Sequence, residues 1–188
     1  MMKRFILRLT FTISLVVSST TLWSMELSSG IKQLYLQQTD GQEKEIGDIE
    51  FTALEAGLYQ YKITLDHHLF KDYFLSMKEM KCLEGPELWC FIPYPYKQPR
   101  TVSAEDMRWL EHDLLFMFKK LDAFGANFWN GIYYRMEVTE QGLRGVAHSL
   151  DLNMLASPPD DLTTPPIEEF DVDEADLEKR WLPYLEIR

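Results

Sequence analysis

The stretch IYYRMEVTEQGLRGVAHSLDL, residues 132–152, decides the fold. Apolar residues occupy every second position in its first half, and the alternation resumes after Gly142. The predicted inward-facing residues are Ile132, Tyr134, Met136 and Val138 before the turn, and Val146, His148, Leu150 and Leu152 after it. A period of two marks a strand with one buried face, and glycine readily takes the positive φ of a hairpin turn. The stretch therefore predicts an antiparallel β-hairpin.

The same alternation runs through residues 49–53, 59–65 and 73–77, nearer the N-terminus. It changes phase at residues 78–79, which predicts a β-bulge, because one extra residue moves the following side chains to the other face. Together with the hairpin at 132–152, these segments predict a domain rich in antiparallel strands.

Two cysteines, Cys82 and Cys90, bracket the sequence LEGPELW at 83–89, whose Gly-Pro pair favours a turn. We expect them to form a disulfide that closes a β-hairpin or tight loop, worth about 2–3 kcal/mol. A redox dithiol would more typically have the spacing C-x-x-C, and a zinc site needs further Cys or His ligands nearby.

The N-terminus, residues 1–24, has the three-part pattern of a secretory signal peptide. Lys3 and Arg4 are basic, an apolar core follows, and cleavage is expected after Ser24, with Ser19 as the alternative. No later segment approaches the length needed to span a membrane. The mature chain is therefore predicted to be soluble and periplasmic, with secretion as the alternative, and export favours pairing of the two cysteines.

Charge excludes several classes of partner. Three of the 19 basic residues lie in the signal peptide and none of the 30 acidic ones does, so the mature chain carries 16 basic residues and a net charge of −14. Such a surface repels nucleic acid and anionic membranes. Basic proteins, cations and neutral ligands remain compatible with it.

Residues 103–121 predict one long amphipathic helix, which Ser103 would cap. Its core-facing stripe is Met107, Leu110, Leu114, Met117 and Leu121. Trp109 and Phe116 fall on nearly the opposite side, where they are either covered by a second layer or exposed as a contact site.

Residues 157–188 complete the chain and are expected to dock on the same domain, 25–156. The first part is acidic and rich in proline, whereas the tail from Trp181 to Ile187 is apolar. Our candidate receiving surface for this tail is the helix face that holds Trp109 and Phe116.

Sequence signatures of catalysis are missing. The chain has no G-x-S-x-G elbow, no phosphate-binding loop, no dinucleotide fingerprint and no H-E-x-x-H. The acidic run at 171–178 does not follow the calcium-loop register, and the four histidines do not have a metal-binding spacing. We therefore expect a protein without cofactor or metal, and a non-catalytic role is favoured over an enzymatic one.

These observations predict an α+β protein in which one long helix packs on an antiparallel sheet or barrel. The layout resembles that of small lipocalin-like envelope proteins, which implies a barrel or a strongly curved sheet.

The leading functional hypothesis is a non-catalytic envelope protein that binds a protein partner, preferably a basic one. The binding residues would be Glu84, Glu87 and Trp89 on the disulfide-closed loop. The alternative is a barrel-type carrier of an apolar or sugar ligand, with a mouth framed by Tyr94, Tyr96 and Trp129. A glycan-acting hydrolase that uses paired carboxylates ranks third.

Overall fold

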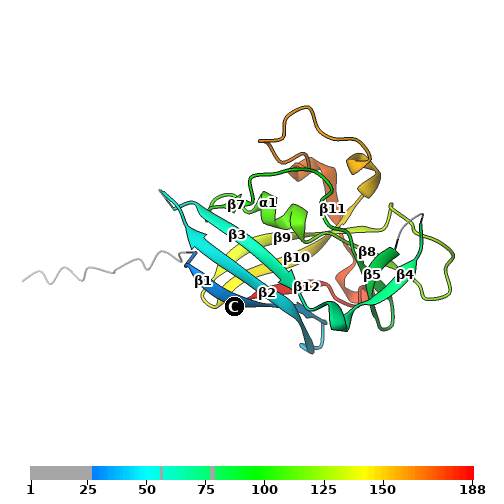
Figure 1. The fold of residues 1–188 in the computed structure, drawn as a ribbon. Helices are drawn as coiled ribbons and strands as arrows, with labels where there is room; N and C mark the ends of the chain where they lie inside the picture. The colour runs from blue at the N-terminus through cyan, green and yellow to red at the C-terminus, as the bar shows by residue number, and fades with distance from the viewer. Residues whose placement is uncertain (1–26, 56, 77–78) are drawn as a thin grey trace, which may run out of the picture.

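One open antiparallel sheet organises the chain in the computed structural model, which describes residues 27–55, 57–76 and 79–188 (Figure 1). The strands of this part of the chain are β1 (Gly30–Gln37), β2 (Glu43–Ala53), β3 (Tyr59–Leu65), β4 (Lys71–Phe74), β5 (Glu79–Glu84), β6 (Leu88–Phe91), β7 (Thr101–Val102), β8 (Phe116–Lys119), β9 (Gly131–Thr139), β10 (Gly142–Leu150), β11 (Val172–Glu174) and β12 (Tyr184–Ile187). The prediction of an antiparallel, strand-rich domain is confirmed.

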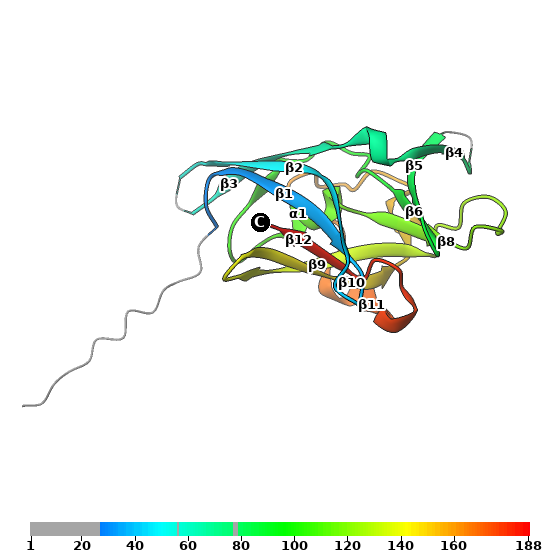
Figure 2. The ribbon, with the colours of Figure 1, turned by 90° about the horizontal axis from the view of Figure 1, so that it is seen from below.

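The order of strands across the sheet is β4-β5-β6-β8-β9-β10-β12-β1-β2-β3-β7, and β11 pairs with β10. The sheet is strongly curved, so that β1–β3 lie opposite β9 and β10, with the short helix α1 (Arg108–Asp113) between them (Figure 2). Four 3₁₀ turns complete the described elements: His67–Leu69, Leu152–Leu155, Glu169–Asp171 and Leu177–Lys179.

The hairpin at 132–152 forms as β9 and β10, and Gly142 adopts φ 142° at its turn. The prediction that Val146 and His148 face inward in the second strand is wrong. Both side chains stay partly exposed, whereas Leu143 and Ala147 are buried. The register explains the error, because Thr139 pairs with Gly142 and so each even-numbered residue of β9 faces an odd-numbered residue of β10.

The predicted helix at 103–121 is wrong in length. Helix α1 ends at Asp113, and residues 116–119 form β8 between β6 and β9. A short apolar run such as LLFM, 114–117, suits a buried helix and a central strand equally well by periodicity. All four of these side chains have no exposed surface, which is the environment of a strand covered on both faces. Ser103 caps only the turn before α1, where it accepts the N–H of Glu105.

The C-terminal tail enters the middle of the sheet as β12, between β10 and β1. Ile187 faces both Leu34 and Leu143, and the side chains of Leu185 and Ile187 have no exposed surface. The tail therefore docks into the sheet itself rather than on the face predicted from Trp109.

The predicted signal peptide at 1–24 and the predicted bulge at 78–79 involve residues outside the described part of the chain. Within residues 27–55, 57–76 and 79–188, no helix has the length and apolar character needed to cross a membrane.

Replacing Leu185 with alanine tests the role of β12. Removal of a fully buried leucine side chain should lower the free energy of unfolding by about 2–5 kcal/mol, because the sheet retains a cavity at its centre. Urea unfolding followed by circular dichroism measures the change. Glu178→Ala on the exposed turn before β12 is the control and should stay within about 0.5 kcal/mol of wild type. Equal stability of the two variants would contradict the central position of β12.

Candidate functional site

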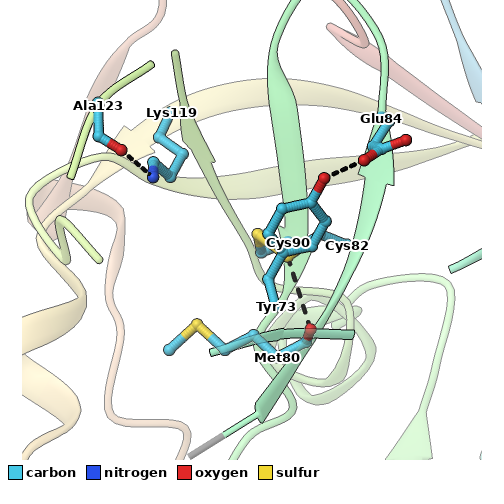
Figure 3. The surroundings of a disulfide bond; sticks show 7 residues. All are labelled: Tyr73, Met80, Cys82, Glu84, Cys90, Lys119 and Ala123. Carbon is cyan, nitrogen blue, oxygen red and sulfur yellow. Dashed lines mark hydrogen bonds between the residues drawn. A yellow bond between two sulfur atoms is a disulfide. The ribbon is translucent and has the colours of Figure 1, made fainter. Parts of the chain in front are cut away.

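The disulfide hairpin consists of β5 and β6, and Figure 3 shows its surroundings. Cys82 and Cys90 are directly opposite each other in the two strands and are joined by a disulfide, as predicted. Both residues are fully buried, so this bond stabilises the hairpin within the core.

The three residues predicted to bind a partner on this hairpin already have partners within the chain. The carboxylate of Glu84 accepts a hydrogen bond from the Tyr73 hydroxyl (Figure 3) and another from Lys71. These two bonds lower the pKa of Glu84. Trp89 has no exposed surface, and its ring lies 5.9 Å from that of Phe118. A docking partner at this hairpin would therefore reach Glu84 but not Trp89.

Glu87 holds the C-terminal segment against the hairpin turn. One carboxylate oxygen lies 3.1 Å from the Arg180 guanidinium and the other accepts the Trp181 backbone N–H at 2.9 Å. The indole of Trp181 lies so close to Gly85 that a Cβ atom there would be 2.3 Å from the ring. Glu87 and Gly85 of this turn thus fix the path of the C-terminal segment into β12 through their contacts with Arg180 and Trp181.

The five aromatic residues predicted to form a mouth or a contact site lie in three separate parts of the structure. Tyr94 and Trp109 are buried, and their rings lie 5.4 Å and 5.6 Å from that of His112. Phe116 is buried within β8, whereas Trp129 is 71% exposed on the loop before β9. The five residues Tyr94, Tyr96, Trp109, Phe116 and Trp129 therefore do not share one surface.

One turn of α1 carries three consecutive ionisable residues that point to different parts of the core. Glu111 accepts hydrogen bonds from the Tyr133 hydroxyl at 2.5 Å and the Met136 N–H at 2.6 Å. Burial raises the pKa of Glu111. It lies in the wall of a polar cavity of about 540 Å³ together with Arg108 and Arg135. Both oxygens of Glu111 are thus engaged by donors.

His112 connects α1 to the acidic C-terminal segment. Its Nδ1 lies 2.6 Å from the Arg108 carbonyl, and its Nε2 lies 3.1 Å from the Ile167 backbone N–H. Nε2 must accept the Ile167 N–H, so the proton of the neutral ring is on Nδ1. Burial lowers the pKa of His112 to about 4.

Asp113 faces the opposite wall of the curved sheet. It accepts a hydrogen bond from the Tyr61 hydroxyl at 2.9 Å, and burial raises the pKa of its carboxyl group. The nearest cation is Arg100, whose Nε lies 3.7 Å from the Asp113 carboxylate. This distance is too long for a hydrogen bond.

An apolar cavity of about 480 Å³ lies beside the proline-rich segment that leaves β6. The Tyr96 hydroxyl donates to the Leu155 carbonyl at 2.8 Å and so fastens this segment to the 3₁₀ turn 152–155. The cavity lies between these two fastened walls, and its apolar lining includes Met80, Phe91, Ile92, Pro93, Phe128, Leu152 and Leu155. His67, Glu79, Lys81 and Asn153 supply the polar lining.

A second cavity of about 220 Å³ adjoins the first, because His67, Phe91 and Pro93 line both. It contains the ionic pair Arg100 and Asp113. The two cavities together form the candidate site, which we call the apolar groove and its polar end.

The residues predicted from the sequence lie only at the edge of this site. Tyr94 lines the polar end, and the hydroxyl bond of Tyr96 shapes the apolar groove, but Arg100 and His67 were not predicted to bind anything. The proline-rich run 91–100 was the available signal, because prolines leave an extended segment without ladder donors. The φ of 56° at Arg100 arises only in the folded chain, and no sequence pattern predicts it.

Comparison with known proteins gives no match to a family model, to a curated protein or to a solved structure. Within residues 27–55, 57–76 and 79–188, no group of three or more His, Cys, Asp or Glu side chains is placed to hold a metal ion.

Acid should weaken the hydrogen bond that the Ile167 backbone N–H donates to His112. The folded-state pKa of about 4 lies below the unfolded value of about 6.5, so the unfolded chain binds the proton first as the pH falls. The stability due to neutral His112 is therefore complete above about pH 6.5 and decreases toward pH 4. The loss by pH 4.5 should be about 2–3 kcal/mol.

Urea unfolding of wild type and His112→Gln at pH 7 and pH 4.5 measures this loss. The difference between the two proteins isolates His112, because Glu111 and Asp113 titrate in both. We expect the advantage of wild type over the variant to shrink at pH 4.5. An equal difference at both pH values would contradict the role of neutral His112.

Proposed function

We propose that this protein is a non-catalytic protein of the cell envelope that binds a small apolar ligand in the apolar groove. The observation that supports this proposal is the cavity of about 480 Å³, whose walls are mainly aliphatic, aromatic and proline side chains. Ligand sites in proteins typically have volumes of about 300–1,000 Å³, apolar walls and a few polar groups that orient the ligand.

The rigid attachment of both walls also favours a preformed site. The backbone N–H of Ile92 donates to Leu115 at 2.9 Å, and the Leu152 N–H donates to Phe128 at 2.8 Å. These bonds and the Tyr96–Leu155 bond fix the groove before a ligand enters. A preformed site avoids the entropic cost of ordering its walls on binding.

A protein partner at the disulfide hairpin has weaker support. Of Glu84, Glu87 and Trp89, Glu87 holds the C-terminal segment and Trp89 is buried. The hydrolase hypothesis is weaker for a similar reason, because donors within the protein occupy both oxygens of Glu111. We therefore rank ligand binding first.

The cell-envelope location rests on two features. The sequence at 1–24 has the pattern of a signal peptide, and the disulfide between Cys82 and Cys90 supports an oxidising compartment such as the periplasm or the extracellular space.

Binding of the neutral fluorescent dye N-phenyl-1-naphthylamine tests the proposal. Wild type should bind one dye molecule in a saturable manner. Ala156→Trp should weaken binding about tenfold or more, which corresponds to about 1.4 kcal/mol, because the new indole fills part of the groove. Fluorescence titration measures both affinities.

Ala53→Trp is the matched control, since Ala53 is also an exposed alanine but does not line the groove. It should bind the dye as wild type does. Absence of saturable binding to wild type, or equal weakening in both variants, would overturn the proposed function.

A further inference from the structure

We propose that the ligand is a long-chain carboxylate, with its chain in the apolar groove and its carboxylate beside Arg100 and His67 at the polar end. This inference rests on the proposed function and adds the chemical class of the ligand. The shared lining by His67, Phe91 and Pro93 makes the two cavities neighbours. An amphiphile can therefore occupy both.

Arg100 has donors to offer to such a head group. Its side chain is 62% exposed and makes no hydrogen bond within the described residues. Its one close ionic partner there is Asp113, at 3.7 Å, beyond hydrogen-bond distance. Guanidinium groups bind carboxylates through two parallel N–H···O bonds, and His67 lines the same cavity.

The backbone places Arg100 at the polar end at a cost in conformational energy. Its φ of 56° is unusual for a residue other than glycine. Two hydrogen bonds maintain this conformation: the Arg100 carbonyl accepts the Tyr61 N–H at 3.0 Å, and the Arg100 N–H donates to the Gln98 side chain at 3.3 Å. Strained residues concentrate at functional sites, where the surrounding structure holds them in place.

The charge balance favours a head group with a single negative charge. Asp113 lines the same cavity, and its side chain is only 14% exposed. Asp113 opposes any anion in this cavity, and its repulsion grows with the charge of the head group, so a dianionic phosphate is disfavoured more strongly than a monoanionic carboxylate.

Displacement of N-phenyl-1-naphthylamine by palmitate and by hexadecanol tests this inference, because the two compounds have chains of equal length and differ in the charge of the head group. Palmitate should bind wild type more tightly than hexadecanol does. Arg100→Gln should weaken palmitate binding about 10- to 100-fold, the range expected for loss of a charge-assisted hydrogen bond, and leave hexadecanol binding unchanged.

Asp113→Asn supplies the opposite change. Asparagine can still accept the Tyr61 hydroxyl, and removal of the negative charge should tighten palmitate binding without an effect on hexadecanol. Circular dichroism and thermal unfolding establish that each variant is folded.

If Arg100→Gln weakens the binding of palmitate and of hexadecanol equally, or weakens the binding of neither compound, the assignment of a carboxylate head group is wrong. If the dye binds but neither palmitate nor hexadecanol displaces it, the inference fails and the proposed function stands. If wild type does not bind the dye, the proposed function itself fails.

Discussion

The pairing of β12 with β10 on one side and with β1 on the other joins the two halves of the sheet (Figure 2). Among the described strands, this pairing connects β1, β2, β3 and β7 with β4, β5, β6, β8, β9 and β10. The candidate site depends on it, because Ile63 and Leu65 of β3 line the polar end, whereas Phe91 at the end of β6 and Phe128 before β9 line the apolar groove. The walls of the site thus come from both sides of this connection.

The segment before β12 is fastened at two points that are distant from each other in sequence. Ile167 donates to His112 of α1, and Trp181 donates to Glu87 at the hairpin turn. These contacts give a structural role to residues that, from sequence alone, suggest function. An acidic side chain beside a tryptophan suits partner recognition, but here it holds the chain on its route into the sheet.

Local patterns predicted much of the fold. The period of two in β2, β3 and β9 and the spacing of Cys82 and Cys90 indicate strands and a hairpin without further information. The run 114–117 could not be assigned, because Phe116 and Met117 pair with strands β6 and β9, which are distant in sequence. The apolar groove could not be predicted either, since its walls meet only after the sheet has curved. Its polar end depends on the backbone conformation of Arg100, which tertiary contacts impose.

We propose that an amphiphile binds along the apolar groove with its head group at Arg100. Isotope-edited NMR of the protein with ¹³C-labelled palmitate tests it most directly, because nuclear Overhauser contacts identify the residues near each end of the chain. We expect contacts from the palmitate chain to Phe128 and Leu152, and from the methylene beside the carboxylate to Pro93 and Ile63. Contacts confined to exposed residues such as Trp129 would contradict it.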